Sequence, residues 1–227
     1  MFVVQMISMH ILRSNFDGDP NLGLYGFATD SFCFTGADRY ASKLRDTLEV
    51  PVHVVHLLNM DLAKIFCAGN SKGIVTPKVI KDFDSEEVEK IRKHADMLSI
   101  DTVYSSVGNL VLMNDSGIVL SPLLKRHRKE MSRFFGIECE ISKIAGMNIV
   151  GSMGFATNKG CLLHPKVKEK EKRLIEKTLQ VDADITTVNF GSPYPGAGLI
   201  ANSNGFAVSE KTSGPELGRI TDVLGFL

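Results

Sequence analysis

The chain has 227 residues, of which 44% are hydrophobic and 23% are charged, a composition typical of a soluble globular protein with a sizeable core. Its 26 basic and 26 acidic residues cancel. No overall positive field therefore drives binding to nucleic acid, and any RNA contact has to be local. No apolar stretch approaches the ~20 residues that a membrane helix needs, which argues against a membrane partner.

The beginning of the chain is apolar, but it lacks the charged segment that opens a secretory signal and it contains polar residues. The cysteines are widely spaced among apolar residues and form no Cys-x-x-Cys pair, a pattern typical of buried, reduced thiols. Both features predict a cytoplasmic protein. The four cysteines are Cys33, Cys67, Cys139 and Cys161.

A four-residue turn motif recurs along the chain, and its closing glycines lie 44, 43 and 45 residues apart. Short apolar runs flank each copy, so the motif predicts a β-hairpin. We expect Asn or Thr to cap the turn, and glycine to adopt the positive φ of a type I turn followed by a bulge. The copies are Asn70–Gly73, Asn114–Gly117, Thr157–Gly160 and Asn202–Gly205, with a degenerate fifth at Thr29–Phe32, where phenylalanine replaces glycine.

A segment with apolar residues along one helical face follows each hairpin, which predicts five one-sided helices. The second has a start signal at Asp84–Glu87, a capping box in which the cap residue and a Glu three positions later satisfy each other's amides. A further strand is predicted after each of the first four helices. The helical segments are 37–48, 88–98, 124–135, 174–179 and 217–224, and the strands are 52–57, 102–104, 138–141 and 184–188.

The fifth helix has no strand after it, whereas a strand without a partner, residues 10–14, precedes the first hairpin. If the repeats close into a ring, this N-terminal strand supplies what the fifth unit lacks, and closure removes exposed sheet edges. We therefore predict an α/β fold, a five-bladed propeller with pseudo-fivefold symmetry and helices outside. Residues 1–227 would form one domain, with repeats at roughly 10–48, 49–98, 99–135, 136–179 and 180–227.

Five short motifs in order at these spacings resemble the translation initiation factor 6 family. The resemblance covers about residue 9 to the end, so residues 1–8 are interpreted as an N-terminal extension. The motifs are Ser105-Ser-Val-Gly-Asn109, Ile149-Val-Gly-Ser152, Thr157-Asn-Lys-Gly-Cys-Leu-Leu-His-Pro165, Thr187-Val-Asn-Phe-Gly-Ser192 and Thr212-Ser-Gly-Pro-Glu-Leu217.

The resemblance implies the pentein fold and a protein without catalytic activity or cofactor. It also implies binding to the intersubunit face of the large ribosomal subunit, to a ribosomal protein there and to 23S rRNA near the sarcin-ricin loop. A factor in that place blocks joining of the small subunit sterically. We expect a monomer with no small-molecule substrate.

The same resemblance makes Asn109 the first candidate for a ribosome contact, although a polar residue there can also simply cap a turn. The turn residues are secondary candidates, because a turn-capping role explains their asparagines equally well. A dense basic run is a candidate for rRNA phosphates, its alternative being a solvated helix face. The secondary candidates are Asn70, Lys72, Asn114, Asn158 and Lys159, and the phosphate candidates are Lys125, Arg126 and Arg128.

Two other functions remain open from the residues alone. Pentein enzymes modify guanidino groups with a nucleophilic Cys and a His, but the closest such pair here, Cys161 and His164, is predicted to point to opposite faces of a strand. The histidines show no metal-ligand spacing, so no metal site is predicted. A self-assembling scaffold is the other alternative, and it would form a stable oligomer.

Overall fold

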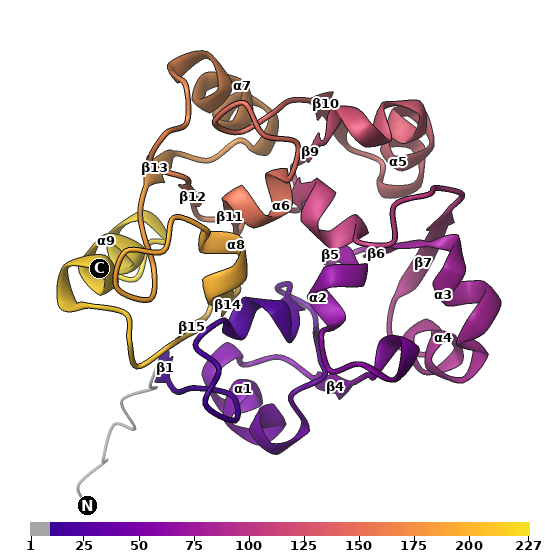
Figure 1. Ribbon diagram of the computed structural model, residues 1–227, viewed down its shortest axis with the longest axis horizontal. Coiled ribbons are helices and arrows are strands. Elements are labelled where there is room, and N and C mark those ends of the chain that lie inside the picture. Colours follow the sequence, from indigo (N-terminus) through magenta and orange to yellow (C-terminus); the bar gives the residue numbers. More distant parts are fainter. Residues whose placement is uncertain (1–9) are drawn as a thin grey trace, which may run out of the picture.

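The computed structural model describes residues 10–227, so the extension at residues 1–8 lies outside the described part. The strands form five separate three-stranded sheets. Figure 1 shows the sheets around a common centre, with the longer helices at the periphery. Each sheet combines an antiparallel hairpin with a third strand that runs parallel to the second strand of the hairpin. The prediction of an α/β protein with five repeated strand units is confirmed.

We number the units by their hairpins along the chain. Unit 1 has β2 (Gly26–Ala28), β3 (Cys33–Thr35) and β4 (Val52–Val54), and unit 2 has β5 (Ala68–Asn70), β6 (Gly73–Pro77) and β7 (Asp96–Ile100). Unit 3 has β8 (Val111–Met113), β9 (Gly117–Leu120) and β10 (Glu138–Ile141), and unit 4 has β11 (Gly154–Ala156), β12 (Cys161–Leu163) and β13 (Ala183–Ile185). Unit 5 has β14 (Leu199–Ala201), β15 (Phe206–Val208) and β1 (Ile11–Arg13).

The N-terminal strand β1 completes the sheet of unit 5, as predicted. It pairs in parallel with β15, with Ile11 opposite Phe206 and Arg13 opposite Val208. The first hairpin strand of unit 5, β14, also packs against β2 of unit 1. The two ends of the chain are therefore joined within one sheet, and the last hairpin contacts the first.

The longer helices are amphipathic, and each buries one face between neighbouring units. The core cluster beneath α7, for example, contains Ile175 of the helix, Cys161 of unit 4 and Val119 of unit 3. No unit thus buries its apolar face alone, which is the physics of repeat proteins. The outer helices are α1 (Ala41–Leu48), α3 (Lys78–Phe83), α4 (Ser85–Arg92), α5 (Arg128–Phe135), α7 (Glu169–Leu179) and α9 (Gly214–Val223), with 3-10 turns η2 (Asp38–Tyr40), η3 (Leu57–Asn59) and η5 (Pro122–His127).

A second set of short helices surrounds the centre, one before each hairpin (Figure 1). Each contacts the short helices of the adjacent units, and the last contacts the first. Four of the five have glycine at the position that faces the carbonyl groups of the preceding unit. A Cβ there would overlap the backbone; at Gly108, for example, it would overlap the carbonyl oxygen of Lys64. The short helices are η1 (Leu22–Leu24), α2 (Ala63–Phe66), η4 (Val107–Leu110), α6 (Val150–Met153) and α8 (Pro195–Gly198).

The predicted conformation of the turn glycines is wrong, because none of them has a positive φ. Gly117, Gly160 and Gly205 lie instead where an outer helix of the next unit ends, and Gly73 lies against the backbone of Asp96 in β7 of its own sheet. A Cβ at Gly117 would overlap the carbonyl oxygen of Thr178, and one at Gly160 would overlap that of Val223. Close approach of another backbone, rather than turn geometry, thus demands glycine here.

The strand predicted at 102–104 is also wrong. Helix α4 ends at Arg92, and the chain then forms β7, in which Leu98 pairs with Val75. Ala95 and Leu98 happen to continue the helical spacing of the apolar residues in α4, which is why the sequence pattern predicts a helix as far as residue 98. Leu98 and Ile100 are two residues apart, as residues on one face of a strand are. Residues 102–104 form a loop in which Val103 is 90% exposed.

The capping box predicted at Asp84–Glu87 does not form, because its carboxylates serve another loop. Asp84 accepts a hydrogen bond from the amide of Leu58 at 2.7 Å, and Glu87 accepts one from the amide of His56 at 3.1 Å. Leu58 has a left-handed φ of 54°. Acidic side chains at a helix start thus hold the left-handed turn that follows the third strand of the preceding sheet.

Candidate functional site

The body has two chemically different ends, which we call the short-helix end and the hairpin-turn end. The first strand of each hairpin runs from a short helix to a turn, as β8 does between η4 and Asn114–Gly117. The second and third strands run back, so the loops after the third strands lie at the short-helix end. The predicted ribosome-binding residues are divided between these two ends.

At the hairpin-turn end, the turn asparagines bind the neighbouring unit. The Asn114 Oδ1 accepts from the amides of Ser116 and Gly117, and its Nδ2 donates to the carbonyls of Thr157 and Leu179 at 3.1 and 2.9 Å. Asn202 repeats this arrangement in unit 5. One side chain thus caps its own turn and the end of the next outer helix, and asparagine has both the acceptor and the donors that this requires.

The second residues of the turns also meet around the centre. Asn158 donates through Nδ2 to the carboxylates of Asp30 and Asp115 at 2.7 and 2.6 Å. Ser71 donates to Asp115 and Ser203 donates to Asp30, each through its hydroxyl and its amide. Five turns of one end are therefore held together by one polar network, in which each carboxylate has several donors.

Of the secondary candidates, Asn70 and Asn114 are buried, and their amide groups are engaged within the protein. Asn158, Lys72 and Lys159 are exposed at the same end. The Lys159 ammonium lies over the ring of Phe226, 5.3 Å from its centroid. The structure thus brings these five candidates together, but at the end opposite to Asn109.

Asn109 lies in η4 at the short-helix end and is half-buried. Its Oδ1 accepts a hydrogen bond from the Ser152 hydroxyl of the next short helix at 3.1 Å. Within residues 10–227 its Nδ2 donates to no protein acceptor. The side chain is thus oriented by one bond and presents two N–H donors to a partner.

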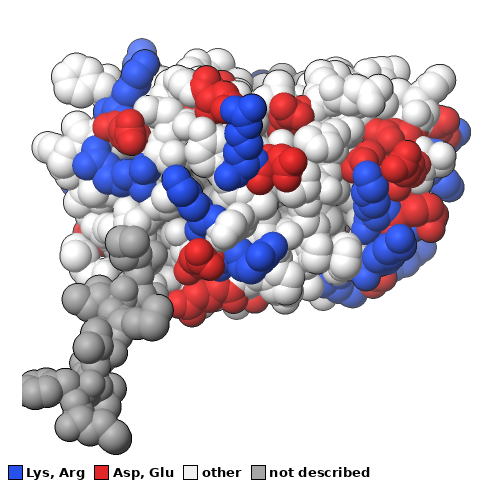
Figure 2. Space-filling model, turned by 90° about the horizontal axis from the view of Figure 1, so that it is seen from below, with Lys and Arg blue, Asp and Glu red and all other residues white. Residues whose placement is uncertain are grey.

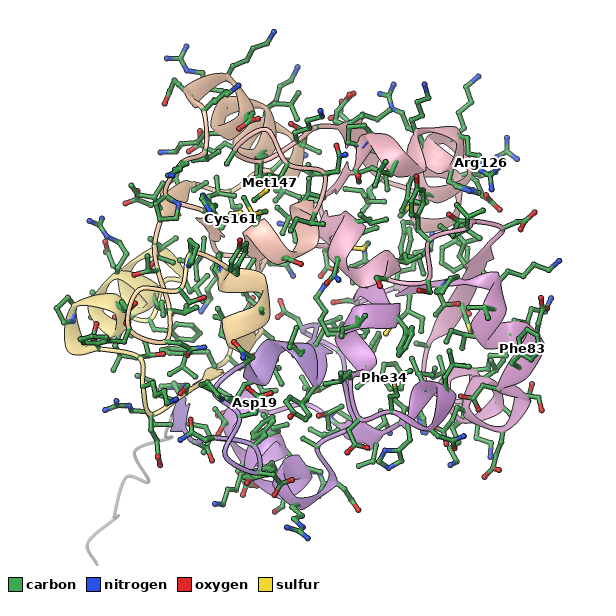
Figure 3. All side chains as sticks on the ribbon, viewed as in Figure 1. Asp19, Phe34, Phe83, Arg126, Met147 and Cys161 are labelled. Carbon is green, nitrogen blue, oxygen red and sulfur yellow. The ribbon has the colours of Figure 1, made fainter. Side chains whose placement is uncertain are left out.

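Large apolar side chains are exposed in the loops of this same end, a feature that the sequence analysis missed. Phe190, in the loop between β13 and α8, is 84% exposed. Figure 3 places Met147 and Asp19 nearer the centre, and Arg126 and Phe83 at the outer edge. The exposed apolar residues of these loops are Met60, Val103, Tyr104, Met147, Phe190 and Tyr194.

The basic run extends into an open groove formed by η5, α5 and the start of β10. Two of its cations are fixed, because Arg126 donates to the Asp101 carbonyl and Arg128 forms an ion pair with Glu140 at 2.6 Å. Three others, Lys125 and Lys129 of the run and Arg133 beyond it, have no ion-pair partner within residues 10–227. The groove is lined by Lys125, Arg126, Arg128, Lys129, Ser132, Arg133, Glu138 and Cys139.

Figure 2 shows where charge gathers on one side of the body. Basic and acidic side chains are interspersed over the outer wall, and most of the upper edge in this view is uncharged. The two signs of charge are thus mixed on this side, in keeping with the equal numbers of acidic and basic residues in the chain.

The centre of the body is nearly filled. Lys64 occupies the position that is glycine in the other four short helices, and its Nζ donates to the Gly108 carbonyl at 3.1 Å. Burial lowers the pKa of Lys64 to about 8. The cavity beside it has a volume of about 40 Å³, far below the several hundred Å³ of ordinary small-molecule pockets.

The cysteines are buried and have the properties of structural thiols. Burial raises the pKa of Cys33, Cys67 and Cys139 to about 12, and it raises that of Cys161 further. A buried thiol with a raised pKa is a poor nucleophile. The His164 ring accepts the amide of Lys166 at 3.0 Å, and no bond joins it to Cys161.

Among residues 10–227, no three His, Cys, Asp or Glu side chains are placed to hold a metal ion. In the same part of the chain, no helix is both long and apolar enough to cross a membrane.

The chain resembles known proteins over almost its whole length. A model of the eIF-6 family matches residues 11–223. Translation initiation factor 6 of Pyrococcus horikoshii is 36% identical over 96% of this chain and 100% of the relative. The proteins of the same name from Haloquadratum walsbyi and Methanocaldococcus jannaschii are 32% and 31% identical over 96% of this chain, and 97% and 99% of the relatives are covered. These relatives are archaeal translation initiation factors. The chain belongs to the eIF-6 family.

Proposed function

We propose that the protein binds the intersubunit face of the large ribosomal subunit in the cytoplasm and prevents the small subunit from joining. Membership of the eIF-6 family supports this function. The partners would be a ribosomal protein at that face and 23S rRNA near the sarcin-ricin loop. Inhibition would be steric, since a folded body on the joining surface needs no chemistry.

We further infer that the five units form one domain, a closed pentein-type propeller with pseudo-fivefold symmetry that acts as a monomer. The pairing of β1 with β15, the packing of β14 on β2 and the mutual contacts of the five short helices support closure. A closed body is rigid, because each unit is held by both neighbours. Rigidity suits a factor that acts by occupying space.

The short-helix end is our choice for the docking surface. The observation that carries this choice is Asn109, a half-exposed amide with an anchored oxygen and two available N–H donors. The hairpin-turn end offers less, because Asn70 and Asn114 are buried and Asn158 is bound between two carboxylates. We assign these turn residues to holding the units together.

Co-sedimentation with isolated subunits tests the function. We expect the protein to migrate with the large subunit alone and to reduce the yield of joined ribosomes. Asn109→Ser should weaken binding roughly 5- to 30-fold, because an interface hydrogen bond contributes about 1–2 kcal/mol.

Asn158→Ser at the opposite end is the matched control, and it should leave the affinity for the large subunit unchanged. If Asn158→Ser weakens binding and Asn109→Ser does not, the hairpin-turn end is the docking surface. If the wild-type protein stays at the top of the gradient at low salt, the proposed function itself is wrong.

The basic groove predicts a salt-dependent part of the affinity. Replacing its three unpaired cations, Lys125, Lys129 and Arg133, by Gln should lower the slope of log affinity against log salt by roughly 2, since each phosphate contact contributes about 0.7–0.9. The measurement is large-subunit binding across a salt series. A charge-matched control on α7, with Lys170, Arg173 and Lys177 changed to Gln, should keep the wild-type slope. Equal slopes for both triple variants would remove the groove from the interface.

A further inference from the structure

Phe190 is an exposed aromatic side chain in a loop that is otherwise well ordered by polar contacts. It lies between β13 and α8 at the short-helix end and is 84% exposed. Burying a phenylalanine side chain is worth about 1.5–3 kcal/mol, so leaving it in water forgoes that stabilisation. A single exposed apolar residue is ordinary in proteins. Left-handed turns held by a carboxylate recur in this fold, at Leu58 with Asp84 and at Ala145–Gly146 with Glu171, but among residues 10–227 Phe190 is the one aromatic residue with a positive φ.

The backbone around Phe190 is left-handed over three successive residues. Asn189, Phe190 and Gly191 have φ values of 53°, 63° and 104°. An aromatic residue with positive φ is strained, and such strain persists only where the surroundings determine the conformation. The turn therefore needs strong local support.

That support comes from two neighbouring elements. The carboxylate of Glu216, at the start of α9, accepts the amides of Phe190 and Gly191 at 3.1 and 2.8 Å. Asn189 donates from Nδ2 to the Pro20 carbonyl of the adjacent unit at 2.9 Å. The loop is thus fixed on both sides, while its aromatic ring makes no ring contact within residues 10–227. The polar contacts hold a strained turn that places an apolar ring in solvent.

The charges nearby indicate which class of partner fits. Residues 186–198, which carry Phe190, contain no charged side chain. The adjacent loop, residues 14–21, contains two carboxylates and no cation of its own; Arg39 pairs with Asp17 at 3.2 Å, whereas Asp19 forms no ion pair within residues 10–227. RNA-stacking aromatics work together with a positively charged groove that tracks the phosphates, whereas these two loops contain no Lys or Arg and include Asp19, which has no ion pair in the described part of the chain. An apolar pocket with a basic rim on a protein is complementary to it.

We propose that Phe190 is the aromatic anchor by which the short-helix end docks on a ribosomal protein, its ring entering an apolar pocket with a basic rim. This inference rests on the proposed binding to the large subunit. The turn preorganises the ring, and a ring held in its bound orientation loses little entropy on docking. Buried aromatic anchors of this kind dominate the affinity of protein interfaces.

The test compares two exposed phenylalanines. Phe190→Ala should weaken large-subunit binding about 30-fold or more, the effect of removing an interface hot spot. Phe83→Ala is the matched control, because Phe83 is 79% exposed at the outer edge, on α3 (Figure 3). Its affinity should stay within about threefold of wild type. Thermal unfolding of both variants checks that each is folded.

Binding to protein-free 23S rRNA separates the two partner classes, and Phe190→Ala should leave it unchanged. Loss of binding to the naked rRNA in this variant would make the partner RNA and overturn the proposal. Wild-type affinity of Phe190→Ala for the whole subunit, with Asn109→Ser still weakened, would refute the anchor and leave the proposed function intact. If the wild-type protein does not bind the subunit at all, the proposed function fails first.

Discussion

Replacing Gly117 by alanine is expected to destabilise the protein by about 3 kcal/mol or more. The new Cβ would overlap the carbonyl oxygen of Thr178, near the end of α7. Neither backbone can retreat easily. The adjacent Asn114 binds the Leu179 carbonyl, and β9 is paired on both sides in its sheet. The methyl group would therefore strain the junction between units 3 and 4. Urea unfolding gives the free energy of unfolding directly.

Gly218→Ala provides the control for this substitution. Gly218 lies inside α9, and an added Cβ there meets no atom within 4 Å. Alanine is the better helix former by roughly 0.5–1 kcal/mol, so this variant should be slightly more stable than wild type. The same chemical change thus has opposite effects at two positions. A loss below about 1 kcal/mol for Gly117→Ala would show that the junction can relax.

The positions of the hairpins, including the degenerate first copy at Thr29–Phe32, could be predicted from sequence, because turn residues between apolar runs are a local signal. The reason for the glycines at 117, 160 and 205 could not be predicted, since it lies in carbonyls of an outer helix from the next unit, such as those of Thr178 and Val223. The first turn has Phe32 because the ring belongs to the same core as Val88 and Ile91 of α4. A bulky residue fills the space there.

The pairing of the N-terminal strand was also predictable, because only one unit lacked a third strand. The boundary after the second helix was not. Apolar residues at 91, 95 and 98 fit a helix, and only the partner strand β6 decides that Leu98 belongs to a strand. Short elements whose spacing fits both periods are settled by tertiary contacts.

The candidate site shows the same division. Asn109 was proposed from resemblance, and its anchored amide becomes visible only beside Ser152. From sequence, Phe190 looks like an ordinary turn residue, because a phenylalanine by itself predicts neither an exposed side chain nor a left-handed backbone. Arg133 joins the basic run of residues 125–129 only once α5 turns it into the same groove. Local sequence finds residues of the right chemistry, and the fold decides which of them share a surface.

Replacing Glu216 by Gln is expected to cost about 2 kcal/mol of stability at neutral pH. Burial alone would raise the pKa of Glu216. Hydrogen bonds from Ser213, Thr187 and Gly191 outweigh it and lower the pKa from 4.5 to about 2. A carboxyl group whose pKa is lower in the folded protein than in the unfolded chain stabilises the fold at pH values above its unfolded pKa. This contribution disappears as the pH falls from 4.5 towards 2. The difference in free energy of unfolding between wild type and variant should therefore be full at pH 7 and shrink below pH 4.5.

Glu169→Gln is the control for the loss of a negative charge at a helix start. Glu169 opens α7 on the surface, where it pairs with Arg173, and its removal should cost less than about 0.5 kcal/mol. An equal loss of unfolding free energy in both variants would mean that Glu216 stabilises the protein only through its negative charge at a helix start.

Glu216→Gln also links stability to binding. A neutral amide holds the amides of Phe190 and Gly191 more weakly than the carboxylate that accepts them now. The left-handed turn should then sample other conformations, and docking through Phe190 would have to reorder it. The variant should therefore bind the large subunit more weakly even at temperatures where it is fully folded, whereas Glu169→Gln should bind like wild type. Weakened binding by a residue that makes no outward contact itself is what a positioning role requires. Unchanged binding in a folded Glu216→Gln variant would separate the strained turn from the interface.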